Sequence, residues 1–146
     1  MPDVSGIRED VNNGKLILDP FEDNNIIDDW IAQNMVVWLQ VRPVAPNGPK
    51  NNAQIGSDGR WGRACQYPFK KPAKGEWENF WHAYKIEPSK EVVRKVFHYH
   101  QRTDASPLRW ITTDMIDMPD YGGGTRYSLF EQNVAIAEWL RSIWHQ

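Results

Sequence analysis

The sequence MVVWLQVR at residues 35–42 indicates a β-strand, and it decides the fold that we expect for this chain. Its β-branched and aromatic residues favour a pleated, partly buried conformation. Pro43 follows directly and lacks the backbone donor that a strand needs, so the strand ends there. Because alternate side chains of a strand share one face, Trp38, Gln40 and Arg42 are expected to lie together.

Two further stretches have the composition of strands. Residues 61–67 (WGRACQY) end at Pro68, and residues 108–113 (LRWITT) are rich in β-branched side chains. Residues 43–60 hold three prolines, three glycines and three asparagines. That composition predicts a long loop with neither a helix nor a strand ladder.

Four stretches have the spacing of helices. The first would begin at an N-cap of Asp23 or Asn24 and bury Ile27 and Ile31. The second covers residues 76–84 (EWENFWHAY), and the third would be capped by Ser89. The surest is the last, because Ser128 and Glu131 form a capping box ahead of an apolar stripe. We therefore expect an α+β fold with a small antiparallel sheet of three to four strands packed against three to four helices.

The length and composition of the chain predict one intracellular domain. Its 146 residues match a single domain, which we place at residues 14–146 with a flexible arm at 1–13. One cysteine and no apolar leader are typical of a cytoplasmic protein. The chain has no apolar run of roughly 18 residues, so we expect no membrane partner.

The distribution of charge and of aromatic residues suggests a binding surface. The chain has eight tryptophans. Residues 1–35 hold eight acidic and two basic residues, a net charge of −6, whereas residues 36–74 hold seven basic residues and one acidic, a net charge of +6. Two strand tryptophans therefore lie in the most basic part of the sequence.

A pair of neighbouring strands would bring these rings and charges together. Trp38 and Arg42 would lie on one strand, beside Trp61, Arg63 and Tyr67 on the next. Such a platform stacks nucleobases and pairs with phosphates. Arg60, Lys70 and Lys71 would extend the positive field. We expect a binding module for single-stranded nucleic acid or a phosphate-bearing ligand; in the alternative interpretation the tryptophans belong to the core and the arginines lie at its edge.

Two other classes of function remain open. A protein–protein adaptor or inhibitor, including one that self-associates, would use tryptophan and arginine as binding hot spots. A small enzyme would use a tryptophan-lined pocket with His82, His98 or His100 as a base. His98 and His100 could share a metal ion only on a strand. The valine spacing at residues 92–96 favours a helix, so we expect neither a metal nor a cofactor.

Overall fold

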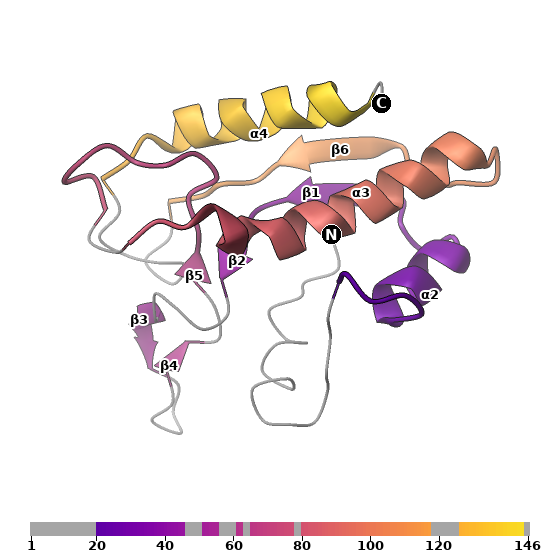
Figure 1. Ribbon diagram of the computed structural model, residues 1–146, viewed down its shortest axis with the longest axis horizontal. Helices are drawn as coiled ribbons and strands as arrows, with labels where there is room; N and C mark the ends of the chain where they lie inside the picture. Colours follow the sequence, from indigo (N-terminus) through magenta and orange to yellow (C-terminus); the bar gives the residue numbers. More distant parts are fainter. Residues whose placement is uncertain are drawn as a thin grey trace.

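The computed structural model describes residues 20–45, 51–55, 61–62, 65–77, 80–117 and 126–144, with side chains at all of these except 45, 51–55, 61–62 and 65. The predicted arm at residues 1–13 lies outside this part of the chain. The elements, in order, are α2 (Ile26–Ala32), β1 (Trp38–Val41), β2 (Val44–Ala45), β3 (Asn51–Ile55), β4 (Trp61–Gly62), β5 (Cys65–Gln66), the 3-10 helix η1 (Ala83–Ile86), α3 (Glu87–Arg102), β6 (Trp110–Thr113) and α4 (Leu129–Trp144) (Figure 1).

The central sheet has two strands, β1 and β6, and they are parallel. Trp38 lies opposite Trp110, and Val41 lies opposite Thr113. Parallel neighbours need a long crossover connection, and α3 lies in the segment that joins these two strands. The prediction of an antiparallel sheet of three to four strands is therefore wrong. Hydrophobic alternation identifies strands but does not say which of them pair or in which direction.

Two short antiparallel pairs stand apart from the central sheet. β2 pairs with β5, and β3 pairs with β4. Both β2 and β3 lie within residues 43–60. The composition of that stretch predicted a loop without paired strands. That prediction is wrong because the breakers sit between these short strands rather than inside them.

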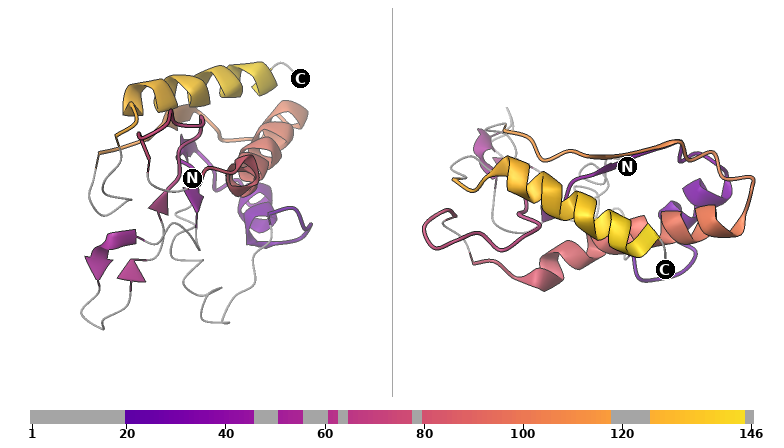
Figure 2. Two further views of the ribbon diagram at one scale, coloured as in Figure 1. Left: turned by 60° about the vertical axis from the view of Figure 1, so that its left-hand side comes forward. Right: turned by 90° about the horizontal axis from the view of Figure 1, so that it is seen from above.

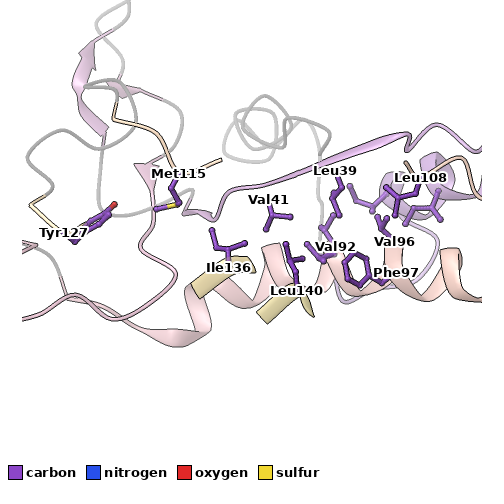
Figure 3. Close-up of a cluster of buried hydrophobic side chains, with 13 residues drawn as sticks. Leu39, Val41, Val92, Val96, Phe97, Leu108, Met115, Tyr127, Ile136 and Leu140 are labelled. Carbon is purple, nitrogen blue, oxygen red and sulfur yellow. The ribbon is translucent and has the colours of Figure 1, made fainter. Parts of the chain in front are cut away.

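Helices α3 and α4 cover the same face of the β1–β6 pair (Figure 2). Leu39 and Val41 point toward these helices and are fully buried, whereas Trp38 on the opposite face is exposed. Figure 3 shows the two β1 side chains among Val92, Val96 and Phe97 of α3 and Ile136 and Leu140 of α4. The core therefore lies on one side of the sheet, and Trp38 lies on the other.

The N-cap of helix α2 lies one residue after the second of the two predicted positions, Asp23 and Asn24. Asn25 is the N-cap, and its side chain accepts hydrogen bonds from the amides of Ile27 and Asp28. Asp28 accepts from the Asn25 amide in return, which completes a capping box. Lys95 of α3 then forms an ion pair with Asp28 at 2.9 Å, so the same carboxylate also ties α2 to α3.

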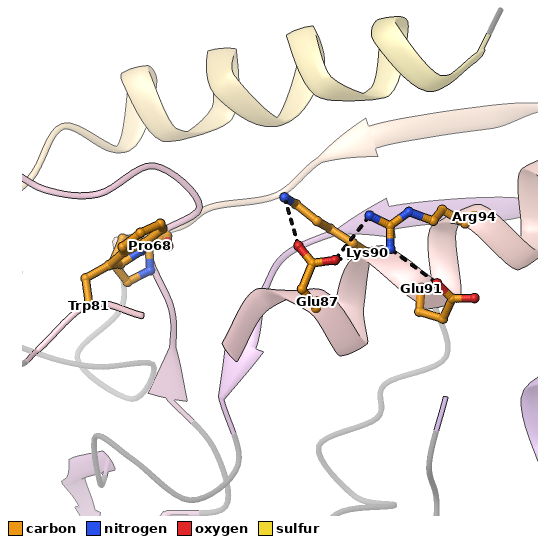
Figure 4. Close-up of polar contacts among 6 residues, drawn as sticks. All are labelled: Pro68, Trp81, Glu87, Lys90, Glu91 and Arg94. Atoms are coloured by element: carbon orange, nitrogen blue, oxygen red, sulfur yellow. Dashed lines mark hydrogen bonds and ion pairs between the residues drawn. The ribbon is translucent and has the colours of Figure 1, made fainter. Parts of the chain in front are cut away.

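Helix α3 begins at Glu87, two residues before the predicted cap. Ser89 is buried in the first turn instead, because η1 runs directly into the helix and Pro88 suits its first turn. Glu87 contacts Lys90 and Arg94, and Arg94 also reaches Glu91 (Figure 4). Burial alone would raise the pKa of Glu87, but the hydrogen bonds and charges of Arg94 and Lys90 outweigh it and lower the pKa below 4.5.

The predicted helix at residues 76–84 is wrong. Residues 80–82 are irregular, and only Ala83–Ile86 forms a short 3-10 helix. The Trp81 indole donates to the carbonyl of Pro68 at 2.8 Å (Figure 4). Tyr67 bonds the backbone of Phe80 and His82. These contacts with a distant part of the chain occupy backbone groups that a helix would use.

The last helix is confirmed. α4 begins at Leu129, and the Ser128 hydroxyl accepts a hydrogen bond from the Glu131 amide at 3.2 Å, as a capping serine does. Ile136 and Leu140 are its buried apolar residues. Within the described ranges, we find no helix whose length and apolarity would allow it to cross a membrane.

Candidate functional site

The face of the β1–β6 pair that turns away from the helices carries two exposed tryptophans. Trp38 is 54% exposed and Trp110 is 69% exposed, although large aromatic side chains are usually buried. They occupy directly opposed positions on neighbouring strands. The same face carries Gln40, Arg42, Thr112 and Asp114, and we call this set of six residues the open sheet face.

The indole of Trp38 is held in place by β6. Its Nε1 donates to the hydroxyl of Thr112 at 3.0 Å. Thr112 lies opposite Gln40, so this bond runs diagonally across the two strands. The ring is therefore oriented across the sheet before any ligand binds, and less rotational freedom is lost on binding.

An ion pair closes the other end of the open sheet face. Arg42 and Asp114 each follow the last residue of their strand, and their side chains meet at 3.1 Å. The guanidinium is thus balanced by a carboxylate. Along the strands, the face therefore presents two exposed rings first, then the Gln40 carboxamide and the Thr112 hydroxyl, and last this ion pair.

The strand that contains Trp61 does not pair with the strand that contains Trp38. β4, which contains Trp61, pairs with β3 and not with β1. The side chains of Arg60, Trp61 and Arg63 lie outside the described residues. The strand pairing that would have placed them beside Trp38 is therefore wrong.

Tyr67 is a core residue rather than part of a binding face. It is fully buried and meets the Trp77 ring edge-on at 4.9 Å. Its hydroxyl accepts from the His82 amide at 2.8 Å and donates to the Phe80 carbonyl at 3.2 Å. Burial raises the pKa of the Tyr67 phenol above its ordinary value of 10.0, against the lowering effect of the His82 hydrogen bond.

Lys70 and Lys71 are exposed, but they belong to a different part of the molecule. The Lys70 ammonium lies 3.5 Å from Glu131 in the first turn of α4. Its backbone is fixed by Gln132, whose side chain accepts from the Lys70 amide and donates to the Lys70 carbonyl. Among the described residues, the predicted basic cluster is therefore separate from the exposed rings.

His98 and His100 lie on one helix and do not share a face. Residues 92–100 are helical, as the valine spacing predicted, so His98 and His100 project in different directions. His100 contacts the Ser106 hydroxyl at 2.9 Å and packs against the Trp144 ring at 5.3 Å. Across the described parts of the chain, no cluster of histidine, cysteine or acidic residues could hold a metal ion.

Sequence reasoning missed Trp110, although a signal was present. The strands read WLQV and WITT, and each begins with tryptophan and has a polar residue two positions later. Aligning these patterns would have placed two rings and two polar groups on one face of a parallel pair.

Comparisons with models of protein families, with curated proteins and with solved structures find no match to this chain.

Proposed function

We propose that the protein is a binding module that holds single-stranded nucleic acid on the open sheet face. The observation that carries the proposal is the pair of exposed indoles, Trp38 and Trp110, at opposed positions of neighbouring strands. Base stacking on an aromatic ring contributes about 1–3 kcal/mol per base. Sheets that carry exposed aromatics on one face and helices on the other are an established way to bind unpaired bases.

The polar groups beside the rings suit base edges. Gln40 offers a carboxamide that both donates and accepts. The Thr112 hydroxyl accepts from Trp38, which leaves its own proton for a ligand. Stacking supplies most of the affinity in this arrangement, and these two groups orient the bases.

The charges of the described residues supply few phosphate contacts. Arg42 is neutralised by Asp114, and Lys70 and Lys71 lie near α4. Arg109, which directly precedes Trp110 in the sequence, is an exposed basic residue just before β6 that could supply one phosphate contact. One such contact predicts a shallow salt dependence, with a slope of roughly −0.7 in a plot of log affinity against log salt concentration.

The test is a fluorescence-anisotropy titration of labelled, mixed-sequence single-stranded RNA with the full chain. We expect saturable binding that Trp38→Ala and Trp110→Ala each weaken by about 1–3 kcal/mol, a factor of roughly 5–150. Phe80→Ala is the matched control, since it removes another highly exposed ring at a distant position. Duplex RNA should bind much more weakly, because its bases are already stacked.

Two outcomes would overturn the proposal. One is the absence of binding at both low and physiological salt. The other is binding that both tryptophan variants leave unchanged, since contact must then lie elsewhere on the chain. Circular dichroism of each variant verifies that the fold is intact, which we expect because both rings are exposed.

A further inference from the structure

The edge of β6 that faces away from β1 has no strand beside it within the described part of the chain. The Asp114 amide donates to the Val41 carbonyl at 3.2 Å, which fits the register of the pair and directs the peptide groups of Trp110 and Thr112 toward β1. Those of Ile111 and Thr113 therefore point to the opposite edge. The sequence WITT has neither proline nor lysine, the residues that commonly protect an exposed edge from pairing.

Helix α4 has a second apolar face on the same side of the molecule. Phe130, Val134, Ala137 and Arg141 recur at spacings of four, three and four residues, so they share one side of the helix. Phe130 is 77% exposed and Val134 is 38% exposed. This side lies roughly 90° around the helix from the buried Ile136 and Leu140. We call these four residues the α4 flank.

A groove joins the strand edge to the α4 flank. It has a volume of about 250 Å³ and is lined by Ile111 and Thr113 of β6 and by Ala137, Leu140 and Arg141 of α4. Phe97 and Trp144 complete its lining, and β1 contributes no residue. The groove therefore lies on the free side of β6, where a further strand and helix would continue the fold.

We propose that a second copy of this chain occupies this side. The two β6 strands would pair antiparallel across a two-fold axis, which gives a continuous sheet of four strands. The C-terminal halves of the two α4 helices, with Ala137 and Arg141 of the flank, would pack over the junction. An edge that pairs with itself in this way needs no other complementary surface, as is usual for isologous dimers.

Charge complementarity supports a second copy as the occupant. The groove sets Ile111 and Thr113 against residues 137–144 of α4, so an axis near the middle of β6 also passes near the middle of that stretch. Two antiparallel α4 helices would then bring Glu138 of one copy close to Arg141 of the other. Neither side chain forms an ion pair with another described residue. Each dimer would hold two such pairs.

The first test is the solution mass of the full chain, measured by sedimentation velocity over a wide range of concentration. We expect a rise from the 17.0 kDa monomer to twice that mass. Ala137→Arg would set a cation beside Arg141 of the other copy and should raise the dissociation constant at least about tenfold. Phe80→Arg, at an exposed site on a different segment, should leave it unchanged. A monomer at every concentration, or an association that Ala137→Arg does not weaken, would overturn the proposal.

The second test examines the predicted register. Glu138→Arg alone and Arg141→Glu alone should each weaken self-association, because each sets like charges against one another. An equimolar mixture of the two variants should associate again, since opposite charges then meet at both pairs. Failure of the mixture to associate more tightly than either variant would exclude this arrangement. Neither residue belongs to the open sheet face, so these outcomes do not depend on nucleic-acid binding.

Discussion

Some aromatic side chains of this protein face solvent and others are buried in the core. The contacts that each ring makes decide which of the two it does. The rings of Trp38 and Trp110 face solvent, whereas Tyr67 is fully buried although it was predicted to stand beside Trp38. Local sequence does not distinguish these cases. Tyr67 is buried because its hydroxyl satisfies two backbone groups, of His82 and Phe80, that lie 13 to 15 positions further along the chain.

Tyr67→Phe should lower the free energy of unfolding by about 1–3 kcal/mol, since it leaves a buried amide and a carbonyl without their partner. Tyr84→Phe, at an exposed ring, is the control and should have little effect. Urea unfolding measures both. The wild type should also lose stability as the pH rises above 10.0, because the raised pKa keeps the phenol protonated when folded while the unfolded chain ionises. An equally steep alkaline loss in Tyr67→Phe would show that another group is responsible.

Three side-chain amides each bond to both the backbone N–H and the backbone carbonyl of one residue in another segment, as a neighbouring strand would. The Gln66 amide exchanges two hydrogen bonds of 3.0 Å with the backbone of Ile116. Gln132 does the same with Lys70, and Asn133 with Met115. Each amide pairs with a single residue as a neighbouring strand would. These contacts tie residues 66–70, the segment after β6 and the first half of α4 to one another.

Gln132→Ala should therefore destabilise the protein by about 2–4 kcal/mol, because a buried amide and a carbonyl of Lys70 both lose their partner. Alanine favours the helix, so the loss cannot come from helix propensity. Gln101→Ala, at an exposed position of α3, is the matched control. Chemical denaturation gives both values, and equal stability of the two variants would contradict the prediction.

The sequence predicted individual elements better than their partners. Residues 35–42 and 108–113 contain β1 and β6, and Ser128 starts α4 as expected. Helical periodicity failed at residues 76–84, where contacts from Tyr67 and Pro68 hold the backbone in another shape. Half of the open sheet face was predicted, through Trp38, Gln40 and Arg42. Trp110 was missed because its strand lies 72 residues from its partner, and the pairing shows only when the two strand sequences are compared with each other.

Among the described residues, the core connects helices α2, α3 and α4 to both strands of the central sheet. One cluster holds Ile27 of α2, Leu39 of β1, Val93 of α3 and Ile136 of α4, and Ile111 of β6 packs against it. A cluster that joins every layer favours cooperative unfolding.

If copies also pair through β6, the open sheet faces of two copies would form one surface with four exposed tryptophans.

Ile136→Ala should lower the free energy of unfolding by about 2–5 kcal/mol, because the side chain is fully buried and its loss leaves a cavity. Tryptophan fluorescence and far-ultraviolet circular dichroism should shift to the same new midpoint in urea. Val134→Ala, on the exposed side of the same helix, should change stability much less. Separate midpoints for the two signals would show that the layers unfold independently.

The parallel pairing of β1 with β6 also affects how the chain is made. Trp38 and Trp110 are 72 positions apart. At a synthesis rate of about 5–20 residues per second, β1 leaves the ribosome roughly 4–14 s before its partner. During that interval the stretch MVVWLQVR is an apolar strand with two open edges. The β1–β6 pair, and the core that packs on it, therefore forms only late in synthesis.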